Sequence, residues 1–336
     1  MTEFNQYFRS HLKSTIRPFI YILVAVLVIT LLIGISQHQP IRHYDYNTGE
    51  WVYSQNYDSL LSVPVTFMCI LIYVIPVIEF SFFKKRINLD CAYSLPISRR
   101  AMGATHYFTG MLMLLGAFTA SYLINFAFLL RQGHGHYNFI PMIFHYLVCI
   151  LFGFAMYSLM VFVFNQANTT GDGIWFMILY TFIFSLIATS FNEFTNNLIR
   201  NDTLLIPWGW IAHLTDCYQY YIELIVNKTS FWKNSENIGC FIFHIAVGIA
   251  SAAGFFITFG KRRMEKTEEI SDSFFGFRVL IPLYAICGML VFSSVLGFWI
   301  AIEFLAILGY TIYRRGFHYK KSDIATLCML MIFLFV

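Results

Sequence analysis

The sequence has little charge for its length. Of its 336 residues only 12% are Asp, Glu, Lys or Arg, and 58% are hydrophobic. In soluble proteins about 25% of the residues are charged and roughly 45–50% are hydrophobic. The formal net charge is only +4 and the cations form no stripe, so nucleic acid is not expected as a partner. A chain this apolar is expected to cross a membrane several times.

Motifs for metal, redox and hydrolytic chemistry are missing from the sequence. The seven cysteines have neither CxxC spacing nor paired Cys/His spacing, so no metal or redox site is expected. HExxH and GxSxG do not occur. The nearest phosphate-loop candidate, residues 254–261, has the wrong spacing and is followed by Arg262 where Ser or Thr is needed. We therefore expect neither an enzyme nor a bound cofactor.

Apolar runs of membrane-spanning length alternate with polar loops. Six runs form a predicted core over residues 18–263, and two more form a tight hairpin within residues 279–336. The predicted spans are 19–36, 63–82, 104–130, 139–164, 174–190, 238–259, 279–296 and 298–313. The tail 324–336 is apolar but too short to span alone, so the chain continues or its end tucks into the bundle. These runs predict an all-α polytopic membrane protein with about eight or nine transmembrane helices.

The distribution of lysine and arginine orients the chain. Seventeen of the 22 Lys and Arg residues fall in segments that the alternation of spans places on one side. The other side receives Arg42, Arg131, Arg200, Lys228 and Lys233. Because cytoplasmic loops carry the excess of cations, the N-terminus is predicted to be cytoplasmic.

The segment 82–103 is the most distinctive loop of the chain. Its cations, Lys84 to Arg86 and then Arg99 and Arg100, flank a single acid, Asp90, which places the loop in the cytoplasm. Leu95-Pro96 interrupts any continuous helix, since proline disfavours helical geometry in the residue before it. The sequence therefore predicts a short helix over 87–94 and an N-cap at Ser98 for the next long helix.

The order of span, basic residues, short helix, "YSLPISRR" and long apolar helix resembles the second cytoplasmic connection of bacterial ABC-2-type transporter permeases. In that family this connection is a coupling helix, which docks in a groove of the ATPase subunit. The resemblance covers residues 1–263. The docking residues that it implies are Tyr93, Leu95, Pro96, Ser98, Arg99 and Arg100. The alternative is an ordinary solvated loop whose cations only fix the orientation.

Three further segments fit the same pattern. Residues 1–17 carry an aromatic stripe opposite a basic face, which is typical of an amphipathic helix lying at the membrane surface. The extracellular loop 191–237 is rich in Trp and Tyr and is broken by Pro207 and Gly209. Short helices dipping into the outer leaflet, similar to those of ABC-2 exporters, are expected there, the alternative being a loop packed on other loops. The linker 264–278 is charged and predicted to be cytoplasmic.

Three polar residues interrupt the predicted spans and are candidates for a substrate path or gate. They are Glu79, Asn125 and Glu303. A carboxylate at mid-membrane costs on the order of 2.5–3.5 kcal/mol on insertion scales, so each is expected to face protein or water. The alternatives are a structural hydrogen bond or, for Glu79, snorkelling to the interface.

The resemblance implies a permease subunit in a bacterial plasma membrane. Its expected partners are a separate ABC ATPase, which binds the ATP, a second identical or related permease chain, and the lipid bilayer. The implied cargo is an amphipathic peptide, lipid or drug, moved outward. The alternatives are an ATP-independent secondary transporter, disfavoured because no inverted repeat with paired interrupted helices is evident, and a polytopic membrane enzyme.

Overall fold

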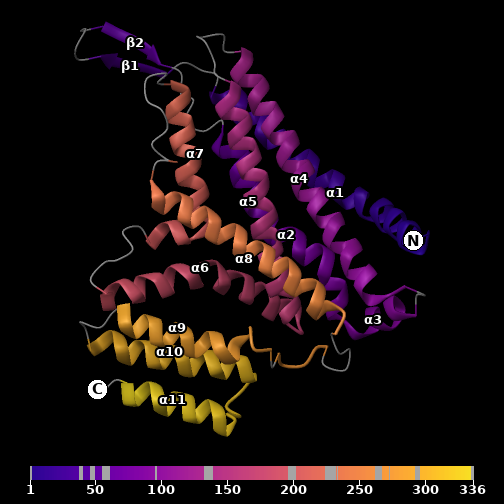
Figure 1. Cartoon of the computed structure of the whole chain (residues 1–336), viewed down its shortest axis with the longest axis vertical. Coiled ribbons are helices and arrows are strands. Elements are labelled where there is room, and N and C mark those ends of the chain that lie inside the picture. The colour runs from indigo at the N-terminus through magenta and orange to yellow at the C-terminus, as the bar shows by residue number, and fades with distance from the viewer. Residues whose placement is uncertain are drawn as a thin grey trace. The chain divides into compact units, whose positions relative to one another are not determined.

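The computed structural model describes residues 2–37, 41–45, 50–54, 61–94, 97–131, 139–195, 202–223, 232, 234–261, 267–271, 273–291 and 296–333. This part of the chain contains eleven α-helices and one β-hairpin (Figure 1). The residues form two compact units. The first comprises Met1–Ile75, Ile97–Ser158 and Trp208–Ala250, and the second comprises Pro76–Pro96, Leu159–Pro207 and Ser251–Val336.

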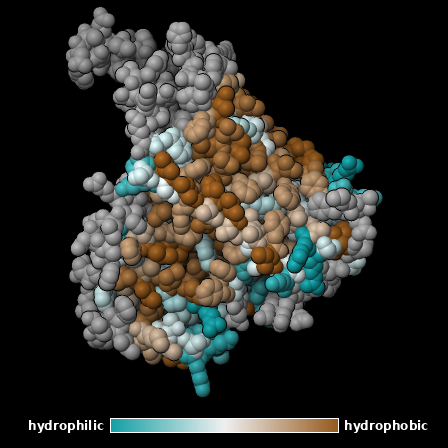
Figure 2. Space-filling view, viewed as in Figure 1, coloured by the Kyte–Doolittle hydropathy of each residue, from teal (hydrophilic) through white to brown (hydrophobic). Residues whose placement is uncertain are grey.

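Six helices are long and apolar enough to cross a membrane, which confirms the six-run core. They are α1 (Thr2–Gln37), α2 (Ser62–Phe80), α4 (Arg99–Arg131), α5 (Phe139–Gln166), α6 (Thr170–Thr195) and α8 (Ser235–Phe259). Brown hydrophobic side chains cover much of the described surface in Figure 2. A large exposed apolar surface is typical of a chain whose surroundings are lipid, so the protein is a multi-pass membrane protein.

Helix α1 continues through Pro18, so no break separates the predicted surface helix 1–17 from the first span. At 1.5 Å per residue its 36 residues reach about 54 Å, well beyond a hydrocarbon core of ~30 Å. One end of α1 must therefore lie outside the core. Helix α1 packs along α4 (Figure 1), where Thr30 and Ser121 share a buried hydrogen bond of 2.9 Å.

The predicted extracellular loop contains two helical elements. These are the 3-10 turn Asp202–Leu205 and helix α7 (Pro207–Glu223). Trp210 of α7 is fully buried in the first unit, where it stacks between Phe152 and Phe241 at centroid distances of 5.3 and 5.2 Å. Its indole N–H donates to the carbonyl oxygen of Asn237 at 3.1 Å. Helices are therefore present in this segment, but α7 is 17 residues long and continues through Gly209. Trp210 packs against helices α5 and α8, and the insertion of this segment into the outer leaflet stays a prediction.

A two-stranded antiparallel hairpin lies where only a turn-rich loop was expected. Strand β1 (Ile41–Asp45) pairs with β2 (Glu50–Ser54), with Ile41 opposite Ser54 and Asp45 opposite Glu50. The all-α fold class is confirmed, and this hairpin is an addition to it that the sequence did not predict. The strand pattern Glu-Trp-Val-Tyr-Ser carries the aromatic and β-branched residues that favour strands.

In the second unit the C-terminal helices pack side by side. They are α9 (Phe277–Val291), α10 (Leu296–Arg314) and α11 (Lys321–Phe333), and α9 also packs on α6. Leu330 of α11 contributes to a core with Ala285, Met289 and Ala306, so the described part of the tail packs against α9 and α10. At 15 residues, α9 reaches about 22 Å, less than a full hydrocarbon core. Six spanning helices are therefore established, and the further spans stay a proposal.

Candidate functional site

The short helix predicted in segment 82–103 is present. After α2 a 3-10 turn, η1 (Ser81–Lys84), leads into helix α3 (Arg86–Tyr93). Leu89 is buried, whereas Ile87 is 77% exposed. Ile87 is therefore an exposed apolar side chain on a short polar helix, where a partner protein could contact it. Ile87 was not among the predicted docking residues. The signal that could have identified it is an apolar residue placed between the polar residues Arg86 and Asn88.

Lys84 lies inside the second unit and not in solvent. It is only 2% exposed, and its ammonium donates to the carbonyl oxygen of Phe164 at 2.8 Å and to that of Ala167. The same ammonium lies 4.9 Å from the centroid of the Phe164 ring. The last carbonyls of a helix have no intrahelical partner and carry partial negative charge, so Lys84 caps the C-terminal end of α5.

Arg86 joins the start of α3 to the linker between α8 and α9. Its Nε donates to the carbonyl oxygen of Thr267 at 2.9 Å, and its main-chain N–H donates to Glu268 at 3.3 Å. The guanidinium also lies 3.5 Å from the Glu269 carboxylate. The described linker residues Thr267, Glu268 and Glu269 therefore contact the start of α3, although the two glutamates stay exposed.

The same linker is hydrogen-bonded to the turn between α5 and α6. Ser271 donates from Oγ to the carbonyl oxygen of Gln166 at 2.9 Å. The main-chain N–H of Glu268, whose φ is 69°, donates to the carbonyl oxygen of Asn168 at 3.3 Å. We call Lys84, Arg86, Gln166, Asn168 and Thr267–Ser271 the cytoplasmic cluster, after the side of the membrane that the charge distribution predicts for it. It ties together the turn η1, the start of α3, the end of α5 and the turn before α6 within one unit.

The predicted docking residues are described only in part. Leu95 and Pro96 lie outside the described residues. Tyr93 is the last residue of α3, and its side chain is likewise outside the described part of the structure. Ser98 caps α4 as predicted, because its Oγ accepts a hydrogen bond from the main-chain N–H of Ala101 at 3.2 Å. Arg99 and Arg100 are exposed at the start of α4.

The three predicted intramembrane polar residues lie on three different helices. Glu79 on α2 is 3% exposed, Asn125 on α4 is 1% exposed and Glu303 on α10 is 5% exposed. Neither amide atom of Asn125 and neither carboxyl oxygen of Glu303 has a hydrogen-bond partner among the described residues. Their role in a substrate path or gate, and the alternative of a structural hydrogen bond, both stay predictions.

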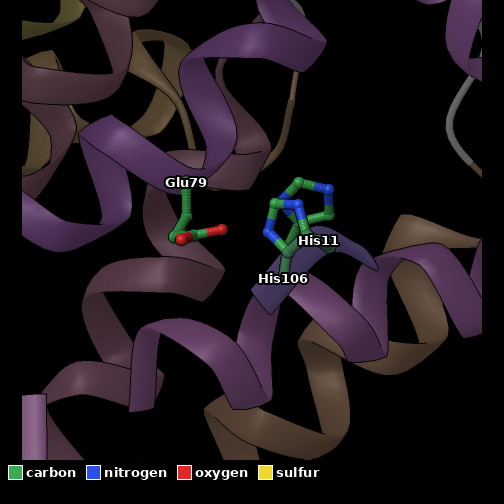
Figure 3. Close-up of side chains that lie close together, drawn as sticks. All are labelled: His11, Glu79 and His106. Carbon is green, nitrogen blue, oxygen red and sulfur yellow. The ribbon is translucent and has the colours of Figure 1, made fainter. Parts of the chain in front are cut away.

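A histidine pair that the sequence did not predict lies in the first unit. His11 of α1 and His106 of α4 face each other with ring centroids 3.9 Å apart (Figure 3). Their ring nitrogens come within 4.8 Å, and the Tyr7 hydroxyl lies 3.4 Å from Nε2 of His106. Figure 3 also labels Glu79, which belongs to the second unit. Only the packing of α1 on α4 brings the two imidazoles together, so no local motif could have revealed the pair.

Comparison of the chain with protein-family models, with curated proteins and with solved structures finds no match.

Proposed function

We propose that the protein is the membrane-spanning permease subunit of an ATP-driven transporter, with α3 as the helix that receives the ATPase. The observation that carries this proposal is the attachment of α3 to the cytoplasmic cluster through Arg86. In this scheme a separate ATPase chain binds and hydrolyses ATP. The permease pairs with a second identical or related permease chain in a bacterial plasma membrane, and it exports an amphipathic peptide, lipid or drug.

The cytoplasmic cluster supports the proposal because it connects a docking element to the ends of spanning helices. A displacement of α3 pulls on Thr267 through the 2.9 Å bond from Arg86. The segment Thr267–Ser271 in turn holds the carbonyl groups of Gln166 and Asn168 at the turn between α5 and α6. Packed elements joined by hydrogen bonds transmit small displacements. A partner that moves α3 therefore has a mechanical route to α5 and α6.

Two separate contacts with the ATPase are proposed, one apolar and one charged. Ile87 is 77% exposed on α3, and Tyr93 and Leu95 follow it in the sequence as the apolar contact. Arg99 is exposed at the start of α4, in the other unit, and would pair with a carboxylate of the ATPase. Pro96, Ser98 and Arg100 complete the proposed docking residues. Apolar anchors surrounded by polar groups carry most of the free energy at protein interfaces.

The test is assembly with the ATPase that is encoded beside this chain or shown to copurify with it. We expect Tyr93→Ala combined with Leu95→Ala, and separately Ile87→Asp, to lower its affinity at least tenfold, a loss of about 1.4 kcal/mol. Arg99→Glu should weaken assembly through charge repulsion. The matched control is Phe274→Ala, because Phe274 is an apolar linker residue that is 73% exposed.

Assembly is measured by copurification, and export by substrate efflux, at matched membrane levels of each variant. Unchanged assembly and unchanged export in all the docking variants would remove the proposed role of α3. Purified alone, the chain should show no ATPase activity above background. Robust hydrolysis by the isolated chain would rule out the permease-subunit role.

One observation favours the second candidate, an ATP-independent secondary transporter. Glu303 is buried on α10, and neither of its oxygens has a hydrogen-bond partner among the residues that the structure describes. Ionisable groups of this kind mark ion or proton pathways in membrane transporters. If Glu303→Gln abolishes transport, and an ion gradient drives transport without any ATPase, the second candidate replaces the first.

A further inference from the structure

An apolar groove runs between helices α6, α9 and α10 in the second unit. Its volume is about 380 Å³. The residues that line it include Trp175 from α6, Tyr284 from α9, and Leu305, Gly309 and Ile312 from α10. All three helices belong to one compact unit, so the groove is a feature of that unit alone.

The lining of the groove offers nothing to a polar ligand. It contains no charged side chain. The Tyr284 hydroxyl already donates to the carbonyl oxygen of Leu179, and the indole of Trp175 lies at the rim, where this residue is 56% exposed. A polar group placed inside would lose its partners in water and gain none. The groove therefore suits a hydrocarbon.

The rim of the groove opens onto the lipid-facing surface. Leu305 is 63% exposed and Ile312 is 71% exposed, and α6 is one of the six candidate membrane spans. The surrounding phase is then hydrocarbon and not water. The residues that line the groove lie near the start of α6, the start of α9 and the end of α10. The charge distribution assigns these three ends to the cytoplasmic side.

Two apolar occupants would suit such a groove, a second protein helix and an acyl chain. A helix is a cylinder with a diameter of about 10 Å, whereas an acyl chain is thin and flexible and can follow the three helices. The exposed cations beside the groove, Arg278 and Arg315, favour a lipid, whose headgroup they can bind.

We propose that this groove binds an acyl chain of an anionic phospholipid from the cytoplasmic leaflet, with Arg278 contacting the headgroup. Arg278 is exposed and directly follows Phe277, which is itself a lining residue. Arg315, also exposed, follows the end of α10 and adds a second cation at the same ends of the helices. Anionic headgroups attract such juxtamembrane cations.

The binding does not depend on the hydrophobic effect, because lipid tails are as apolar as the groove. It depends on filling a void, since atoms that line an empty space lose their dispersion contacts. The shape of the groove therefore decides occupancy, and the headgroup decides which lipid occupies it. The site does not rest on the permease function proposed above, and it requires only that α6 lies in a bilayer.

The test uses the full chain in phosphatidylcholine nanodiscs that contain a phosphatidylglycerol with a diazirine in its acyl chain. Light should attach this lipid to peptides of α9 and α10. Gly309→Leu should lower the yield at least fivefold by filling the groove. Gly309→Ala should not, because an added Cβ would lie 3.5 Å or more from Ile281. Gly171→Leu is the matched control, since no atom lies within 4 Å of a Cβ added there.

The thermal midpoint of each variant shows that it folds. If Gly309→Leu does not fold, Leu305→Trp blocks the mouth from an exposed position and should lower the yield similarly. Unlabelled phosphatidylglycerol should compete better than phosphatidylcholine with the same chains. This preference should be lost in Arg278→Gln and kept in the control Lys321→Gln.

Four results would overturn the proposal or a part of it. An unchanged yield in folded Gly309→Leu would show that the groove holds no acyl chain. Equal labelling of α1 and of the groove peptides would show only general contact with lipid. A cysteine at Leu305 that cross-links to another protein chain would show a protein partner instead. Equal competition by both lipids would overturn the role of Arg278.

Discussion

The ammonium of Lys84 lies 2.8 Å from the carbonyl oxygen of Phe164, 80 positions along the chain. This contact fixes the segment before α3 to the end of α5. Sequence reasoning treated Lys84 as a solvated cation that orients the chain, along with its neighbours. The structure gives it a packing role as well.

Lys84→Met should destabilise the protein. The methionine keeps most of the apolar stem but leaves the carbonyl groups of Phe164 and Ala167 without their charged donor. Hydrogen bonds to charged groups contribute about 1.5–3 kcal/mol each, so the thermal midpoint should fall by several degrees. The control is Lys85→Met, because Lys85 is exposed. Equal midpoints for the two variants would contradict the capping role.

A second charged contact fixes the end of α10 to the start of α11. The Arg314 guanidinium holds the Asp323 carboxylate by two hydrogen bonds of 2.7 and 2.9 Å, and the two side chains are 6% and 2% exposed. Asp323→Asn should destabilise by about 3–5 kcal/mol, because it leaves a buried guanidinium without its counter-charge. Arg314→Met combined with Asp323→Leu should restore much of the loss, while Arg315→Met, at an exposed site, should change little. Urea titrations of the purified protein measure these differences.

The same pair predicts how stability depends on pH. Burial raises the pKa of Asp323, but hydrogen bonds from Arg314 and from the main chain of Lys320 outweigh it, and the net pKa is lowered. A lowered pKa adds stability that is fully present above the unfolded value of about 3.9 and is lost as the pH falls through the folded value. Below about pH 4 the wild type should therefore lose stability faster than the Arg314→Met/Asp323→Leu variant. Parallel slopes for the two proteins would contradict this.

Trp210 should hold α7 in place. Trp210→Phe keeps a ring between Phe152 and Phe241 but leaves the Asn237 carbonyl without its donor, a loss of about 1 kcal/mol. Trp210→Ala should cost about 3–5 kcal/mol, because it opens a cavity. Trp208→Phe is the control, since Trp208 is only partly buried and donates to the Tyr73 hydroxyl at 3.1 Å. Proteolysis within residues 224–231 should accelerate most for Trp210→Ala, and equal rates would contradict the anchoring role.

Orientation can be tested with single cysteines in a background without cysteine. A cysteine at Ser235, which is exposed at the start of α8, should react with an impermeant reagent in intact cells, as should one at Ser54. Ser271 lies in the linker that is predicted to be cytoplasmic, but it is 1% exposed, so a cysteine there would react poorly on either side. Glu269 is the better reporter, with a side chain 58% exposed, and should react only after lysis. Labelling of Glu269→Cys in intact cells would show that the predicted orientation is wrong.

The elements that the sequence predicted well are those set by local physics. Long apolar runs define the six spans, and the Ser98 cap and the short helix α3 follow from residues close together in the chain. The hairpin of β1 and β2 was missed because polar and turn-forming residues surround two short strand patterns. Charge counting predicts which segments are cytoplasmic, but it could not show which cations are buried.

The contacts that build the candidate site depend on packing and could not be predicted. Lys84 and Lys85 are neighbours of the same type, yet one caps α5 and the other is exposed. The linker residue Glu268 reaches Asn168 only because its φ of 69° turns the chain. His11 and His106 face each other only because α1 packs on α4. Such contacts join residues far apart in the sequence, where no periodicity or motif reports them.

Arg86→Ala is the sharpest test of force transmission, and it rests on the proposed permease function. The Arg86 side chain is 56% exposed and its ion pairs reach 3.5 and 3.9 Å, so removing it should cost less than about 1 kcal/mol of stability. The docking side chains Ile87 and Tyr93 stay in place, so the ATPase should still bind. Export should nevertheless fall several-fold, because the link from α3 to Thr267 is lost.

Lys85→Ala is the control for this experiment, since it removes the adjacent exposed cation and leaves that link intact. The measurements are copurification of the ATPase, its ATPase rate in the complex, and substrate efflux from proteoliposomes. If force passes through Arg86, the Arg86→Ala variant should assemble with the ATPase and hydrolyse ATP normally, but its substrate efflux should be reduced. Wild-type efflux in Arg86→Ala would show that force does not pass through the Arg86 side chain, because the main-chain bond to Glu268 remains in this variant. Loss of assembly would instead show that Arg86 belongs to the docking surface itself, because the variant would then fail before any force is transmitted.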